Sequence, residues 1–330
     1  MSKLIIGKTA NDVWIESVNC LKEIKTILPC RTGQMYELPH VFMTIENPKE
    51  KWIYDRIPPI SVAFALAEVV WIVNGKSESK IINYWNSQLS RFSGNSEFYH
   101  GAYGNRIRLH FGFDQLERAY NALKNNPNTR QVVIQIYDSA IDFPTDKGEP
   151  QDNDIPCNIC SILKIRDNKL EWSQIMRSND VLLGTPYNFV QYTSLQEILA
   201  GWLDIGVGSY NHYSDSLHLY ERDIKKIGIN ANNKIIYNKD SLSIPKKESD
   251  KLFKEIYQRM SYIVNNHLTE EELINISKLN SKYEAFNNIM TVITAYSAKK
   301  NFGNNLSDKI MENCTNNMYT YLWNQWSKRK

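Results

Sequence analysis

Residues 157–178, "CNICSILKIRDNKLEWSQIMRS", have the pattern of two strands joined by a tight turn. Segments 157–165 and 170–178 are rich in β-branched, aromatic and other apolar residues, and the polar "RDNK" between them is typical of a hairpin turn. Residues 185–203, "TPYNFVQYTSLQEILAGWL", predict a helix, with Pro186 in its first turn, where a missing N–H is tolerated. This order predicts antiparallel strands packed against helices, which is an α+β fold.

Further helices and a further strand are expected on either side of this hairpin. Residues 60–74, "ISVAFALAEVVWIVN", are almost wholly apolar and are followed by Gly75, so they predict a buried helix. Apolar spacing predicts helices at 10–28 and 112–124 and a strand at 130–138. From about residue 245 the pattern is helical, so we expect one domain over residues 1–330 with a helical C-terminal extension at about 245–330.

The composition is that of a soluble globular protein, with 42% apolar and 23% charged residues among 330. Lys and Arg (39) exceed Asp and Glu (36) by 3, which argues against dedicated nucleic-acid binding. No apolar run is long enough for a membrane span, and the N-terminus lacks the pattern of a signal peptide. These features predict a cytoplasmic protein that binds neither membrane nor nucleic acid.

Two of the five cysteines, Cys157 and Cys160, form a Cys-x-x-Cys motif. A zinc site needs a second ligand pair, and side chains three apart in a regular strand face opposite sides, so we predict neither a metal site nor a redox pair. Cys157 stands where a loop enters a strand, and Arg177 lies on the facing strand. It is therefore a candidate nucleophile, although a buried structural thiol is an open alternative.

Residues 176–188, "MRSNDVLLGTPYN", decide between these alternatives, because they resemble the signature of the thymidylate synthase family. That signature is Arg-Ser-x-Asp-x-x-x-Gly-x-Pro-aromatic-Asn, placed shortly after a Pro-Cys pair, which here is Pro156-Cys157. Further segments resemble family motifs in the family's order: "CRTG" (30–33), "AEVVWIVNG" (67–75), "HGAYGNRIR" (100–108), "NPNTRQ" (126–131) and "SLHLY" (216–220). The resemblance covers about residues 10–225 and implies a mixed sheet packed with helices.

The resemblance implies covalent catalysis on a pyrimidine nucleotide. The family transfers a one-carbon unit from 5,10-methylenetetrahydrofolate to carbon 5 of the base, after a cysteine thiolate has added to carbon 6. The positions that match its catalytic residues are Cys157, Glu68, Tyr103 and Asp180. Glu68 is a lone carboxylate in an apolar helix, where burial would raise its pKa and suit it to general acid–base work, unless it reaches solvent or an arginine.

Other positions match the family's binding residues. For the phosphate these are Arg31, Arg130, Arg177 and Ser178; for the sugar hydroxyl His218 and Tyr220; for the base Asn188 and Asn158; for the folate Asp180, Gly184 and Trp85. In the family the equivalent of Arg130 comes from the partner subunit, so a homodimer with shared sites is expected. For each arginine alone, a solvated surface charge is the plain alternative.

The residues around the base leave uracil and cytosine, and a methyl and a hydroxymethyl product, open as alternatives. Asn188 favours uracil, but Asn158 stands where thymidylate synthases carry His, and a rotated amide would suit cytosine. Gln131 and Ser216 stand where the family has Arg and Asp, and its apolar C-terminal end, which excludes water from the site, is not visible.

These departures favour a hydroxymethylase acting on a uridylate or cytidylate, ribo or deoxy. The alternatives are a thymidylate synthase, which makes a methyl group, and a non-catalytic relative that binds nucleotide or RNA.

Overall fold

The computed structural model describes residues 2–30, 32–230 and 236–329. Its centre is a mixed, eight-stranded sheet in the spatial order β1-β3-β9-β7-β6-β5, with β2 paired to β3 and β8 paired to β9. The strands span β1 (Lys3–Gly7), β2 (Leu28–Cys30), β3 (Gly33–Ile45), β5 (Val132–Gln135), β6 (Asn158–Arg166), β7 (Lys169–Met176), β8 (Asn179–Asp180) and β9 (Gly206–Tyr220). The sheet contains both parallel pairs (β1–β3, β7–β9, β8–β9) and antiparallel ones, so the predicted α+β class is confirmed.

The predicted hairpin is present as β6 and β7. Asp167 and Asn168 form its turn with φ of 49° and 55°, the left-handed conformation that two-residue hairpin turns require and that Asp and Asn tolerate. Cross-strand pairing begins at Asn158 and Met176 and shifts by one residue before Cys160 pairs with Ile175. This bulge places β6 out of regular alternation at the end that carries the Cys-x-x-Cys motif.

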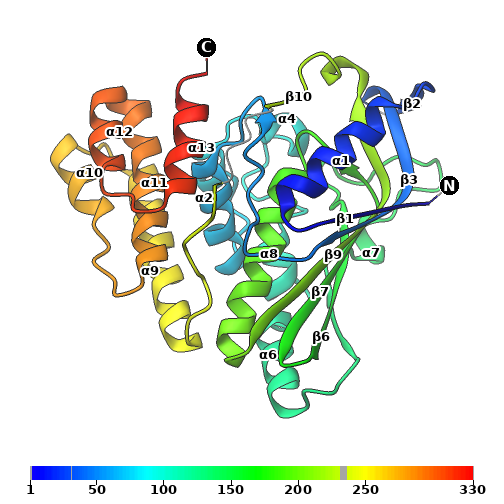
Figure 1. Ribbon diagram of the computed structural model, residues 1–330, viewed down its shortest axis with the longest axis horizontal. Helices are drawn as coiled ribbons and strands as arrows, with labels where there is room; N and C mark the ends of the chain where they lie inside the picture. Colours follow the sequence, from blue (N-terminus) through cyan, green and yellow to red (C-terminus); the bar gives the residue numbers. More distant parts are fainter. Residues whose placement is uncertain (1, 31, 231–235, 330) are drawn as a thin grey trace.

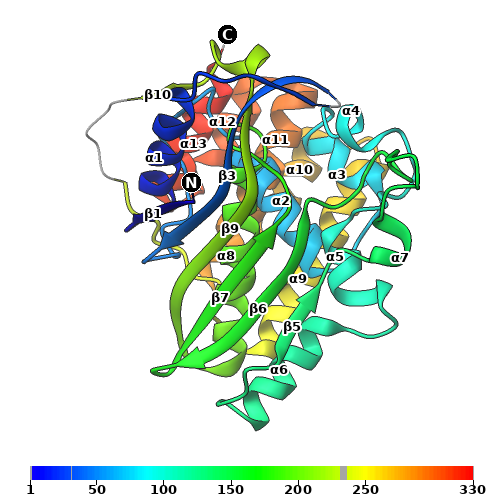
Figure 2. The same cartoon turned by 90° about the vertical axis from the view of Figure 1, so that its right-hand side faces the viewer.

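The helices gather mainly on one face of the sheet, and the other face is turned to the viewer in Figure 2. They are α1 (Ala10–Lys22), α2 (Val62–Val73), α3 (Ser79–Trp85), α4 (Ser90–Ser93), α5 (Tyr103–Asn105), α6 (Gln115–Asn125), α7 (Ser139–Asp142), α8 (Thr185–Leu203), α9 (Lys246–Asn265), α10 (Glu270–Ser277), α11 (Glu284–Phe302), α12 (Asn304–Met311) and α13 (Asn317–Ser327). A π-helical turn (Arg106–His110), a 3₁₀ turn (Glu221–Asp223) and a two-stranded sheet of β4 (Arg56–Ile57) and β10 (Gly228–Ile229) complete the elements.

Helix α2 lies at the centre of the molecule (Figure 1). It begins after Ser61, whose hydroxyl accepts a hydrogen bond from Phe64 N at 3.2 Å, and ends before Gly75 with φ of 68°. One side packs against α8, and α9, α11 and α13 pack on its other sides. The prediction of a buried helix here is confirmed.

Two expectations about local structure need correction. The helix expected over residues 10–28 ends at Lys22, because Leu28–Cys30 pairs with β3 as an edge strand. Residues 206–220 form the long strand β9, for which we had predicted no element. Its inward side chains include Tyr210, His212 and Ser214, so polar residues obscure the hydrophobic alternation that marks a strand.

A buried ion pair joins three segments around α8. Lys51 Nζ lies 2.6 Å from Glu197 Oε2, with side chains 3% and 2% exposed. The second oxygen, Oε1, accepts from the Ser241 hydroxyl at 2.9 Å and from Leu242 N at 3.1 Å. The pair therefore ties α8 to the chain before α2 and to the chain before α9.

We expect Lys51→Met to lower the free energy of unfolding by about 3 kcal/mol or more, because the variant leaves a buried carboxylate without its cation. Urea unfolding of the full chain measures this. The same substitution at the exposed Lys226, which pairs with Asp223 at 2.7 Å, should cost about 1 kcal/mol or less. Equal losses in the two variants would contradict a stabilising role for the buried pair.

Candidate active site

Cys157 immediately precedes β6 and is held against the end of β7. The Arg177 backbone N–H donates to Cys157 O at 3.0 Å. The Arg177 guanidinium donates to the carbonyls just before the cysteine, from Nε to Pro156 O and from Nη2 to Ile155 O, both at 3.0 Å. The structure thus brings the predicted nucleophile and a predicted phosphate ligand together, with Cys157 partly exposed.

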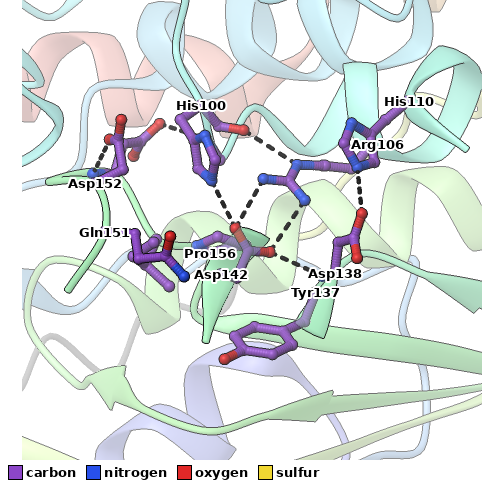
Figure 3. A network of polar contacts seen from close by, with 12 residues as sticks. His100, Arg106, His110, Tyr137, Asp138, Asp142, Gln151, Asp152 and Pro156 are labelled. Atoms are coloured by element: carbon purple, nitrogen blue, oxygen red, sulfur yellow. Dashed lines mark hydrogen bonds and ion pairs between the residues drawn. The ribbon is translucent and has the colours of Figure 1, made fainter. Parts of the chain in front are cut away.

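The loop that leads to Cys157 is fixed by a polar network (Figure 3). Arg106 makes a two-pronged ion pair with Asp142, from Nη1 to Oδ2 at 3.0 Å and from Nη2 to Oδ1 at 2.9 Å. His100 Nε2 lies 2.6 Å from Asp142 Oδ1, and Gly101 N donates to Asp154 Oδ2 at 2.8 Å. Residues 100–106, which carry Tyr103, are therefore fixed against residues 138–157, which carry the predicted nucleophile.

Glu68 projects from α2, and its Oε2 atom is buried without a hydrogen-bond partner among the described residues. Burial raises the pKa of Glu68 to about 7, against the opposing influence of the Gln191 side chain. Burial likewise raises the pKa of Tyr103 and of Tyr192 well above the usual value, and for both the charges of Cys157 and Glu68 add to the shift. The side chains of Glu68, Tyr103, Tyr192, Cys157 and Gln191 therefore lie together in one poorly hydrated region.

Two amides also belong to this region. Asn158 is fully buried, and its Oδ1 accepts from Gln174 Nε2 at 2.8 Å. Asn188, near the start of α8, donates from Nδ2 to Asn179 Oδ1 at 3.2 Å and to Met176 Sδ at 3.5 Å. Because Met176 is the strand partner of Asn158, the two amides that were predicted to contact the base approach the same place.

The pairing of β8 with β9 positions the remaining predicted ligands. Asp180 lies opposite His218, and the rings of His218 and Tyr220 stand edge to face at 5.0 Å. Asp180 Oδ1 accepts from Leu182 N and Leu183 N, and burial raises its pKa while His218 opposes the shift. An added Cβ on Gly184 would lie 3.1 Å from Asn179 Oδ1 and 3.2 Å from Asp180 O, so this close approach favours glycine.

Trp85 and Arg130 lie apart from this assembly. Trp85 is enclosed between α3 and α11, 2% exposed, with its indole N–H donating to Ile293 O at 3.2 Å, so its ring is not open to a ligand. Arg130 is exposed on the loop before β5, and Ser178 is partly exposed between β7 and β8. Arg31 lies outside the described residues.

The structure also adds residues that the sequence reasoning missed. Arg56 is 5% exposed, and its Nε and Nη1 atoms have no hydrogen-bond partner in the described part of the chain. Burial lowers its pKa, while the neighbouring Tyr187 and Asp180 oppose the shift. Gln191 follows Asn188 by one helical turn, so helical spacing could have found it; nothing in the sequence around Arg56 sets that residue apart.

Arg222 is another such residue. Its guanidinium lies over the Tyr220 ring at 4.1 Å and donates to Thr32 O at 2.7 Å, which places a cation beside the loop that resembles the family's Arg-Thr-Gly.

The strand geometry of the Cys-x-x-Cys motif differs from the regular strand that was expected. The bulge between Asn158 and Cys160 corrects the assumption of regular alternation on which our first argument rested. Cys160 lies beside Ile175 and Gln135, and burial raises its pKa. Within residues 2–30, 32–230 and 236–329, no cluster of three or more His, Cys, Asp or Glu side chains suits a metal ion.

Residues 57–273 match the family model of thymidylate synthase. The chain belongs to the thymidylate synthase family. This confirms the resemblance of its motifs and makes the protein a one-carbon transferase that acts on carbon 5 of a pyrimidine nucleotide, in a family that uses methylenetetrahydrofolate as cosubstrate.

Individual relatives carry two different names. A deoxyuridylate hydroxymethyltransferase of Bacillus phage SP01 is 28% identical over 271 residues, which cover 78% of this chain and 70% of that protein. A second deoxyuridylate hydroxymethyltransferase, of Pseudomonas phage M6, is 29% identical over 200 residues, which cover 60% of this chain and 56% of that protein. A thymidylate synthase of Clostridium beijerinckii is 28% identical over 227 residues, 66% of this chain and 78% of its own.

None of the helices in the described ranges is both long and apolar enough to cross a membrane.

The raised pKa of Glu68 predicts a specific pH dependence of stability. The folded state binds this proton more tightly than the unfolded chain, so stability is full below the ordinary value of 4.5 and falls as the pH rises toward about 7. Glu68→Gln removes this fall, so relative to the wild type the variant should gain about 2–3 kcal/mol between pH 4 and pH 8. Urea unfolding at both pH values measures the gain, and an identical pH dependence in the two proteins would contradict a buried, protonated Glu68.

Proposed function

We propose that the protein transfers a hydroxymethyl group to carbon 5 of a uridylate, with methylenetetrahydrofolate as the one-carbon donor. The names of the two phage relatives support this product. The observation that carries the proposal is a set of buried polar atoms beside Cys157: Glu68 Oε2, Gln191 Oε1 and Tyr192 OH, all without partners among the described residues. Such a set can hold a water molecule, since buried waters need two to four polar partners.

The first chemical step belongs to Cys157. Its thiolate forms a bond to carbon 6, and the electron pair of the 5,6 double bond moves toward carbon 5 and the 4-oxo group. The unpartnered Nδ2 of Asn158 is a suitable donor to that oxygen as charge develops on it. Arg177 and the other predicted arginines would hold the phosphate and so orient the ring.

The residues near Asp180 fit a folate. A pterin edge presents one carbonyl acceptor beside ring and amino N–H donors, and its attached ring is aromatic. Arg56 offers unpartnered donors, the Asp180 carboxylate offers acceptors, and Tyr187 offers an aromatic face. When bound, the folate supplies the one-carbon unit at the oxidation level of formaldehyde.

The last step distinguishes a hydroxymethylase from a thymidylate synthase. Before this step, carbon 5 would have bonded to the one-carbon unit and lost its proton, with tetrahydrofolate as the leaving group. Water then attacks the methylene group on carbon 5, its proton passes to Glu68, the 5,6 double bond re-forms and the Cys157 thiolate leaves. A carboxylate with a pKa of about 7 can accept this proton near neutral pH. In a thymidylate synthase a hydride takes the place of the water and yields a methyl group.

A homodimer is the second part of this proposal, and the uncovered sheet face supports it. Strand register aligns one row of outward side chains across the sheet: Leu4, Phe42, Tyr213, Ile175, Cys160 and Gln135. Leu4 is 64% and Phe42 49% exposed, and an apolar row of this kind on a sheet face marks an interaction surface. The exposed Arg130 lies two residues before the edge strand β5, and in the proposed dimer it enters the site of the partner subunit.

A product assay tests the reaction. The wild type, incubated with methylenetetrahydrofolate and each of UMP, dUMP, CMP and dCMP, should yield a nucleotide heavier by CH₂O and release tetrahydrofolate. Cys157→Ala should abolish turnover. A product heavier by CH₂, with dihydrofolate released, would replace the hydroxymethylase with a thymidylate synthase.

A substitution at Gln191, one of the three residues proposed to hold the water molecule, makes this assay more specific. Gln191→Leu should lower hydroxymethyl formation about tenfold or more, because the water loses one partner. Tritium release from carbon 5 precedes the attack of water and should fall much less. Equal losses in both measurements would contradict a role for Gln191 in holding the water.

Mixed dimers test the shared site. Cys157→Ala and Arg130→Ala should each be inactive or nearly so when pure. After subunit exchange, one site of each mixed dimer has both native residues, so activity should recover to about a quarter of wild type. No recovery under conditions where exchange is demonstrated by mass spectrometry would contradict the donation of Arg130 across the interface.

A further inference from the structure

A chain of buried hydrogen bonds leads from the core to Asn158. Trp172 Nε1–H donates to Gln174 Oε1 at 3.3 Å, and the Ser161 hydroxyl donates to the same oxygen at 2.6 Å. Gln174 Nε2 then donates to Asn158 Oδ1 at 2.8 Å. All four side chains are fully buried.

The donor-to-acceptor direction of this series of hydrogen bonds is fixed by its first residue, Trp172. An indole N–H can only donate, so Gln174 must turn its oxygen toward Trp172 and its NH₂ group toward Asn158. Asn158 must then turn its own oxygen toward Gln174, which leaves its NH₂ group facing away. That Nδ2 atom is buried and forms no hydrogen bond of ordinary geometry among the described residues. It lies beside the Tyr103 hydroxyl, and the Asn158 amide acts to lower the pKa of Tyr103 against the larger effect of burial.

We propose that Trp172 and Gln174 are positioning residues that fix Asn158 as a hydrogen-bond donor to position 4 of the base, and so select uracil over cytosine. This rests on the proposed function, in which Asn158, directly after the nucleophile, faces the base. Uracil carries an oxygen at position 4 and completes the chain. Cytosine carries an amino group there, so two donors would face each other in a buried site, which leaves both unpaired.

The orientation of the second amide, that of Asn188, is also fixed, and it also suits uracil. Asn188 turns its NH₂ group toward Asn179 Oδ1 and Met176 Sδ, which leaves its carbonyl oxygen for the ring N3–H of uracil. Asn179 in turn donates to Ser214 Oγ at 3.0 Å and lies 3.1 Å from His212 Nε2. Burial lowers the pKa of His212 to about 3, so its ring is neutral and this nitrogen is free to accept.

The direct test is Gln174→Glu. A carboxylate has no N–H to donate, so its second oxygen should draw the Asn158 NH₂ group toward itself and turn the Asn158 oxygen to the base. The reversed amide suits the amino group of cytosine. We expect the ratio of kcat/KM for uridylate to that for cytidylate, measured as tritium release from carbon 5, to fall at least about thirtyfold.

Three further variants distinguish a reversed Asn158 amide from general damage to the site. Gln174→Met removes the bond without reversing it, and Trp172→Phe removes the donor that fixes the direction, so both should lower the ratio by a smaller factor than Gln174→Glu. Gln196→Glu makes the same chemical change at another buried glutamine, which donates to Leu170 O at 2.8 Å and to Ser209 O at 3.0 Å. This control should leave the ratio unchanged, because the Gln196 amide donates to strand carbonyls and not to Asn158.

The outcomes distinguish the inference from the function on which it rests. Tritium release from neither nucleotide by the wild type would overturn the function itself. A wild type that prefers cytidylate, or a ratio that stays within about twofold in both Gln174→Glu and Trp172→Phe, would overturn the positioning role. Because the ratio is taken on one preparation, partial unfolding lowers both rates alike, and Trp172→Phe decides if Gln174→Glu does not fold.

Discussion

The pairing of β6 with β7 is the interaction on which the site depends. It places Arg177 N against Cys157 O and Met176 against Asn158. The proposed nucleophile, a proposed phosphate ligand and the amides proposed to contact the base therefore meet at one end of one hairpin. A slip by one residue would turn each of these side chains to the other face of the sheet. The bulge before Cys160 adds a second constraint, because it lets Asn158 and Ser161, three apart, both face the core.

Several buried polar atoms of the candidate site lower the stability of the fold. Glu68 Oε2, Asn158 Nδ2, Gln191 Oε1, Tyr192 OH and two nitrogens of Arg56 are buried without partners among the described residues. Each such atom forgoes hydrogen bonds to water and destabilises the fold. In the proposed reaction a nucleotide, a water molecule and a folate provide the missing partners, so binding recovers part of this cost and draws the substrates into a dry, directional site.

The sequence predicted the local parts of this arrangement well. The hairpin, the apolar α2 and α8 with Pro186 in its first turn follow from residue propensity and hydrophobic pattern. The motif spacing from Pro156-Cys157 to Asn188 identified the family. The sequence could not predict relations that depend on tertiary contacts. The bulge, the burial of Arg56, the enclosure of Trp85 by α11 and the direction of the Trp172–Gln174–Asn158 chain all arise where distant segments pack together. The amide of Asn158 is the plainest case, because its orientation depends on an indole in the next strand.

Covalent attack by Cys157 on the base is the central claim. Its most direct measurement uses 5-fluorouridylate with methylenetetrahydrofolate, because fluorine at carbon 5 blocks the loss that would complete the reaction and leaves the nucleotide bound to the enzyme. Digestion and fragment-ion mass spectrometry then locate the attachment. We predict that nucleotide and folate are found together on Cys157, with Cys160 unmodified. Attachment to Cys160, or no covalent complex at all, would contradict the account.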